Sequence, residues 1–164
     1  METQVVQMER VTFVSKKPFN EIIEKLADAI GHPDVHEFHQ SVFEANTISQ
    51  VEAIVKKAVG SSELMEFARF DSGGIVGKVP NKNGRKILRL LVGNPVIMEE
   101  MATTVPDAAA YAPVTILVSE RPDGVHLAYD SMASLLAPYE DEEALKVARA
   151  LDVKVKTLLN TIAE

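Results

Sequence analysis

Three of the four histidines fall within eight residues, in the segment GHPDVHEFH at positions 31–39. On a helix that advances by about 100° per residue, His32, His36 and His39 would lie within about 80° of one another. Imidazole is the commonest metal ligand in proteins, and two imidazoles one helical turn apart can chelate one ion. The spacing therefore predicts a zinc site or, because aromatic side chains flank the histidines, a haem site with one axial histidine.

A structural role is the favoured alternative for these histidines. Histidines at the border of an amphipathic helix often cap carbonyl groups or face solvent, and a complete zinc site needs three or four converging ligands. A zinc-protease motif is excluded, because two residues separate His36 from His39 and the HExxH motif requires three.

A basic window lies between Asp71 and Glu99, where no acidic residue occurs. Its basic residues are Lys78, Lys82, Arg85, Lys86 and Arg89. Downstream, Asn94 followed by proline predicts a helix start, which presents free N–H groups and a positive dipole end to an anion. The hypothesis is an anion site formed by Asn94, Arg89 and Arg69. The favoured alternative is a plain helix start beside a solvated loop, because helix starts of this kind are common without ligands.

Other phosphate-binding and hydrolase motifs fail. The segment GGIVGK at 73–78 resembles a phosphate-binding loop, but Ser72 stands where the first glycine is required and Val79 replaces the hydroxyl residue that binds magnesium. A GxGxxG fingerprint is absent, and no serine lies in a nucleophile-elbow motif.

Arg69, Asp71, Tyr129 and Asp130 form a third candidate set, because their predicted strands could converge at one end of a sheet. Two carboxylates in different environments could divide acid and base roles. A structural ion pair between arginine and aspartate is the favoured alternative. The sequence assigns no catalytic residue, and whether the protein is an enzyme stays open.

Composition limits the classes of protein to consider. A chain of 164 residues fits one domain, and the absence of cysteine excludes disulfides, thiolate catalysis and cysteine-bound metals. Seventeen basic and twenty-four acidic residues give a net charge of −7, which argues against nucleic-acid binding. Without a signal-peptide pattern or an apolar run of about 20 residues, we expect a soluble cytoplasmic protein that does not enter membranes.

Periodicity and turn residues predict five strands and at least five helices. The strands are expected at 4–14, 64–71, 86–92, 114–119 and 125–130, with an Asn83-Gly84 turn before the third. The helices are expected at 19–30, 32–43 and 49–59, from Asn94 onward, and at 141–162. Helices at both ends of a strand-rich chain indicate an α+β fold with helices on one face of the sheet.

Finer patterns assign faces and caps within these elements. On the fifth strand, Val125, Leu127 and Tyr129 share one face, and His126 and its alternate neighbours share the other. Ser49 and Glu52 are expected to cap the third helix as a capping box. The last helix should bury Leu145, Ala148, Leu151, Val155, Leu158 and Ile162.

Several short motifs, in this order and spacing, resemble the bacterial and archaeal domain-of-unknown-function family 302 (DUF302). They are FARFD (67–71), LLVGNP (90–95), the M-x-x-x-x-P spacing of Met101 and Pro106, APVTILV (112–118), DGVHLAYD (123–130) and SLLAP (134–138). The resemblance implies a two-layer α/β sandwich with a mixed sheet. It implies no activity.

Two features depart from that family. Many members carry histidine directly after the aspartate that matches Asp71, whereas this chain has Ser72, so no role of that histidine carries over. The segment near 32–60 also resembles an extra helical insertion. We therefore expect a single domain over 1–164, with a family-like core at about 4–30 and 63–162.

The leading interpretation is a protein that binds a small molecule between the sheet and the inserted helices, and that forms a homo-oligomer, such as a homodimer. One alternative is a metal- or haem-binding protein that uses the histidines of the insertion. Another is an enzyme of unknown reaction with acid–base residues at the sheet end. Zinc and haem are the cofactors that the sequence suggests.

Overall fold

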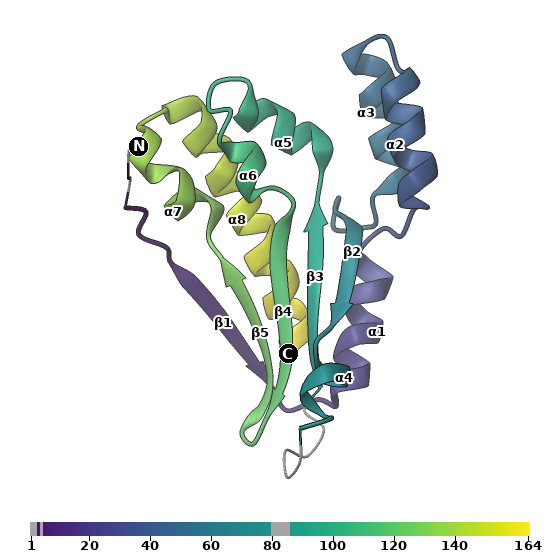
Figure 1. Ribbon diagram of the computed structural model, residues 1–164, viewed down its shortest axis with the longest axis vertical. Helices are drawn as coiled ribbons and strands as arrows, with labels where there is room; N and C mark the ends of the chain where they lie inside the picture. Colours follow the sequence, from purple (N-terminus) through teal and green to yellow (C-terminus); the bar gives the residue numbers. More distant parts are fainter. Residues whose placement is uncertain (1–2, 4, 80–85) are drawn as a thin grey trace.

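The computed structural model describes residues 3, 5–79 and 86–164, and its centre is one five-stranded sheet (Figure 1). The strands are β1 (Arg10–Ser15), β2 (Met65–Asp71), β3 (Ile87–Gly93), β4 (Val114–Arg121) and β5 (Gly124–Asp130). Their spatial order is β1-β5-β4-β3-β2. The predicted α+β fold with five strands is confirmed. The sheet is antiparallel rather than mixed, because each strand runs opposite to its neighbours.

Helices cover one face of the sheet and one of its ends. They are α1 (Phe19–Ala29), α2 (Val35–Glu44), α3 (Ile48–Ala58), α4 (Gly73–Val76), α5 (Pro95–Ala102), α6 (Ala108–Tyr111), α7 (Met132–Leu136), the 3-10 helix η1 (Ala137–Tyr139) and α8 (Glu142–Ala163). In Figure 1, α1 and α8 lie behind the sheet, and its other face is turned toward the viewer.

The main core lies between the sheet and α8. On β5 the expected alternation is confirmed, because Val125, Leu127 and Tyr129 belong to this core. The register aligns Leu127 with Val118 of β4, and Val118 with Leu88 of β3, so one apolar row crosses three strands.

Helix α8 buries a slightly different stripe from the predicted one. Leu151 and Val155 are buried as expected. Leu159 is fully buried whereas Leu158 is only partly buried, because a step of four residues from Val155 keeps the side chain on the same helix face. The same face also buries Asp152, which the apolar pattern did not predict.

Helices α2 and α3 form a hairpin beside the upper end of β2 (Figure 1). A small second core of Phe38, Val55 and Met65 joins the hairpin to β2. At the tip of the hairpin, Phe43 is 91% exposed.

Both hairpin helices begin at other residues than predicted. Helix α2 starts after Asp34, whose side chain accepts a hydrogen bond from the Glu37 amide, so His32 lies before the helix. The cap of α3 is Thr47 rather than Ser49, and Thr47 accepts from the amide of Gln50. The turn expected at 83–84 lies outside the described residues.

The segment after β2, expected to be a loop, contains the short helix α4. The predicted helix start at Asn94 is confirmed, with Pro95 as the first residue of α5. Among the described residues, no helix combines the length and apolar character that crossing a bilayer requires.

Candidate functional site

A cleft of about 600 Å³ lies between α1 and the strands β2 and β3. We call it the α1 cleft. Its apolar wall is formed mainly by Phe19, Ile23 and Leu88. Its polar residues are Asn20, Glu24, Arg69, Asp71 and Lys86.

Arg69 reaches this cleft because β2 is irregular. The register with β3 shifts between Glu66 and Ala68, so Phe67 is an extra residue in a β-bulge. In a regular strand Glu66 and Arg69 would point to opposite faces. Here they pair with Val92 and Leu90, which both face the main core. The bulge therefore turns Arg69 toward the helix-covered face.

Glu66 is the main partner of Arg69. Nε and Nη2 of Arg69 donate to the two carboxylate oxygens of Glu66 at 2.9 and 2.8 Å. This hydrogen bonding raises the pKa of Arg69 further above its ordinary value. His32 Nδ1 lies 3.7 Å from the same carboxylate. The Glu66 carboxylate thus lies against two predicted site residues, Arg69 and His32, although no sequence pattern had marked Glu66 itself.

Asp71 and Lys86 place opposite charges on the cleft. Asp71 Oδ1 accepts a hydrogen bond from the Gly74 amide at 3.1 Å, which fixes the start of α4. Lys86 Nζ lies 5.6 Å from the centre of the Phe19 ring, within the range of a cation–π contact. The same ammonium is 3.8 Å from a Glu120 oxygen, so its ion pair is loose.

The predicted acid–base set does not assemble. Tyr129 and Arg69 lie in one row of the sheet, but Ile116 and Leu90 separate them. Asp130 instead forms a bidentate ion pair with Arg10 of β1, whose Nε and Nη2 donate to the two carboxylate oxygens at 2.6 and 2.8 Å. These four residues therefore share no site, because β3 and β4 lie between their strands.

The three residues of the predicted anion site are also separated. Asn94 caps α5 by accepting from the Val96 amide at 3.0 Å, and its Nδ2 donates to the Glu63 carbonyl. Arg89 lies five residues earlier on β3 and contacts the Phe70 ring at 5.9 Å. Arg69 faces the opposite side of the sheet from Arg89, since the register pairs Arg69 with Leu90. Of the predicted anion site, the structure therefore keeps only the helix start at Asn94, without the two arginines.

The three clustered histidines are exposed and do not converge. His32 lies outside α2, and its Nε2 is 3.2 Å from the Ala27 carbonyl oxygen. His39 packs against Phe38 and Phe67, with ring centres 5.9 and 6.4 Å away. In the described part of the chain, no group of three histidine, aspartate or glutamate side chains is arranged to hold a metal.

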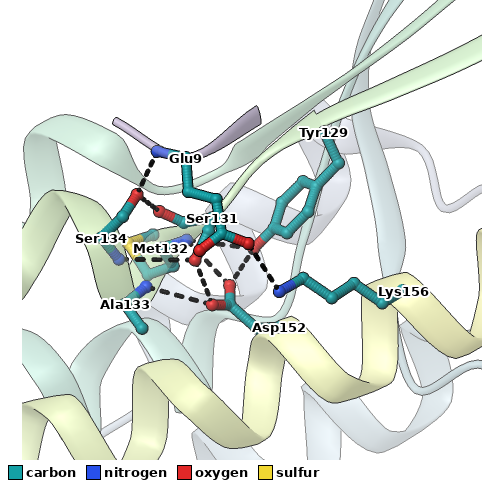
Figure 2. Close-up of polar contacts among 8 residues, drawn as sticks. All are labelled: Glu9, Tyr129, Ser131, Met132, Ala133, Ser134, Asp152 and Lys156. Carbon is teal, nitrogen blue, oxygen red and sulfur yellow. Dashed lines mark hydrogen bonds and ion pairs between the residues drawn. The ribbon is translucent and has the colours of Figure 1, made fainter. Parts of the chain in front are cut away.

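A buried polar cluster around Asp152 joins α8 to β5 and α7 (Figure 2). The Asp152 carboxylate accepts from the Tyr129 hydroxyl at 2.7 Å and from the Met132 amide at 2.8 Å. The Ser131 hydroxyl and the Ala133 amide also donate to it. Burial, and then the nearby Asp152 charge, raise the pKa of Tyr129 well above its ordinary value.

This cluster is a structural crosslink. Each carboxylate oxygen of Asp152 already accepts two hydrogen bonds from the chain, and Tyr129 is held in its protonated form. The sequence signal that could have found it is an aspartate one turn after Ala148 in the apolar stripe of α8.

Comparison with known proteins gives a family but no activity. Residues 39–162 match the family model described as "Domain of unknown function DUF302". The chain is also similar in fold to the crystal structure of an uncharacterized conserved DUF302 protein from Bacillus stearothermophilus. The TM-score is 0.64 and the identity 11%, over 94% of this chain and 98% of that one. No curated protein sequence matches the chain. Because the family model covers more than half of its residues, the chain belongs to the DUF302 family.

Proposed function

We propose that this protein binds a small zwitterionic molecule with an apolar side group, such as an amino acid, in the α1 cleft. The observation that carries the proposal is the pairing of an apolar wall with two basic and two acidic side chains around one cleft of about 600 Å³. Ligand sites commonly have volumes of about 300–1,000 Å³, mostly apolar walls and a few placed polar groups.

The apolar group of the ligand would lie against Phe19, Ile23 and Leu88. Phe19 and Leu88 are each 8% exposed, so they form a firm wall that belongs to the main core. A rigid wall of this kind favours binding, because little side-chain freedom is lost when a ligand covers it.

The cleft offers a partner for each charged group of the ligand. Asp71 uses one carboxylate oxygen for the Gly74 amide, and its other oxygen can accept from a ligand ammonium group. Lys86, whose only carboxylate neighbour in the described residues is the loosely held Glu120, can pair with a ligand carboxylate. Arg69 is less available, because Glu66 holds it in a bidentate ion pair.

The proposed position differs from the one expected from the sequence. The ligand was expected between the sheet and the inserted helices, whereas the α1 cleft has no lining residue from α2 or α3. The cleft instead takes its polar side chains from α1, β2 and the residue before β3.

Thermal-shift measurements with phenylalanine, phenethylamine and phenylpropionate test the proposal. We expect the zwitterion to raise Tm most, since the two analogues each lack one charged group. Gly74→Leu should abolish the gain by filling the cleft. A Cβ at Gly74 would only touch Asp71 at 3.5 Å, so the fold can accept it.

Ala53→Leu, at an exposed position of α3 outside the cleft, is the matched control and should keep the gain. The proposal is wrong if none of the three compounds raises Tm, or if Gly74→Leu and wild type respond equally.

A further inference from the structure

A second cleft, of about 460 Å³, lies where the β4–β5 hairpin turns. We call it the hairpin cleft. The two clefts share the lining residue Ile87, but the site described below requires no ligand in the α1 cleft. One row of the sheet runs through it, in which His126 pairs with Ser119 and Ser119 pairs with Ile87. These side chains alternate with those of the main core, so the cleft lies on the sheet face opposite α8.

His126 is the unusual residue of this cleft. It is 9% exposed, and its Nε2 lies 2.9 Å from Asp123 Oδ1. Hydrogen bonding to His126 lowers the pKa of Asp123, so the carboxylate is ionised at neutral pH. In the neutral ring, Nε2 then carries the proton and Nδ1 presents a lone pair.

That Nδ1 atom is buried and has no hydrogen-bond partner in the described part of the chain. Buried polar atoms nearly always have a partner, and the exceptions call for a missing water, ion or ligand. The lone pair of Nδ1 in the neutral ring can accept a hydrogen bond, so a ligand that pairs with it carries an N–H or O–H group.

Arg121 adds a positive charge to the same cleft. Its Nε donates to Ser119 Oγ at 3.2 Å, which orients the guanidinium group. Among the described residues, Arg121 forms no ion pair with a carboxylate, whereas Glu120 beside it pairs with Lys86. Ser119 accepts from Arg121, so its own hydroxyl proton remains to be donated.

We propose that the hairpin cleft binds a small oxyanion that carries a proton, of the monohydrogen phosphate type. Arg121 and Ser119 donate to its charged oxygens, and its protonated oxygen donates to His126 Nδ1. Nδ1 is buried, so this contact requires the side chains at the rim of the cleft to move when the ion binds.

Phosphate and sulfate separate this proposal from general attraction of anions. At mildly alkaline pH both are dianions of similar size, but only phosphate retains a proton. The measurement is ¹⁵N NMR of the histidine ring nitrogens of the full chain, titrated with each salt at equal ionic strength. We expect phosphate to shift the His126 Nδ1 resonance in a saturable way and sulfate to leave it in place.

Arg121→Gln should weaken phosphate binding by about tenfold or more, since it removes a charge-assisted contact. Arg121 is exposed, so this variant keeps the fold and remains informative even if a His126 variant does not. Arg149→Gln, an exposed arginine of α8, is the control and should bind as wild type does. Equal shifts with both salts, no shift with either, or unchanged binding by Arg121→Gln would overturn the proposal.

Discussion

Glu66 and Arg69 lie three residues apart on β2 and still form a bidentate ion pair on one face of the sheet. The β-bulge at Phe67 makes this geometry accessible, because it adds one residue to the alternation of the strand. Arg69 and Asp71 then follow on the face that α1 covers, where both line the α1 cleft. The position of the cleft therefore depends on one irregularity in an edge strand.

Replacing Asp152 with alanine should destabilise the protein by about 3–5 kcal/mol. The substitution leaves the buried Tyr129 and Ser131 hydroxyls without their acceptor, and it leaves the Met132 amide only its longer contact, at 3.4 Å, to the Tyr129 hydroxyl. Urea unfolding measures the loss. Asp28→Ala, an exposed position of α1, should change stability by no more than about 0.5 kcal/mol. Similar small effects for both variants would show that the cluster does not crosslink α8.

The free energy of unfolding should fall at alkaline pH, because Tyr129 ionises less readily in the folded protein than in the unfolded chain. Its pKa is raised in the folded state, so its contribution is complete below the unfolded value of about 10 and declines as pH rises above it. For one group the decline is at most about 1.4 kcal/mol per pH unit. Unfolding free energies of wild type and Tyr129→Phe should therefore run parallel below that pH and converge above it. Parallel curves throughout would contradict this assignment.

The buried face of α8 can be tested with two adjacent leucines. Leu159→Ala should cost about 2–5 kcal/mol, because it opens a cavity in the main core. Leu158 is only partly buried, so Leu158→Ala should cost clearly less. Thermal unfolding compares the two variants, and the reverse ranking would mean that the helix presents another face.

The cap of α3 offers a second local test. Thr47→Ala should lower stability by about 0.5–2 kcal/mol, because it removes the acceptor for the Gln50 amide. Ser49→Ala should have little effect, since Ser49 is exposed within the helix. Chemical denaturation, or amide exchange within α3, distinguishes the two. A larger effect at Ser49 would restore the cap predicted from the sequence.

Local patterns predicted most of the elements but little of the site. The strand alternation at Val125–Tyr129 and the helix start at Asn94 each depend on a few neighbouring residues, and both are confirmed. The direction of strand pairing, the bulge at Phe67 and the hydrogen bonds from the first amides of α7 to Asp152 depend on residues far apart in the chain. No local periodicity encodes them.

The histidine prediction shows the same limit. Helical spacing would place His32 beside His36 only if the helix included both, and the Asp34 cap starts α2 after His32. His126, outside that cluster, has the buried and unpartnered ring nitrogen. Its position on the strand was predicted, and so was the turn at 122–124, but the contact between the His126 ring and Asp123 was not.

The most direct test of ligand binding in the α1 cleft is a backbone amide NMR titration with phenylalanine. We expect saturable shifts at Gly73, Gly74 and Leu88, which line the cleft, and the loss of the Gly73 and Leu88 shifts in Gly74→Leu. Resonances of α3, which contributes no residue to the cleft, should stay in place. If Gly73, Gly74 and Leu88 of the wild type do not respond to phenylalanine, or if Gly73 and Leu88 respond equally in Gly74→Leu, the α1 cleft is not the ligand site.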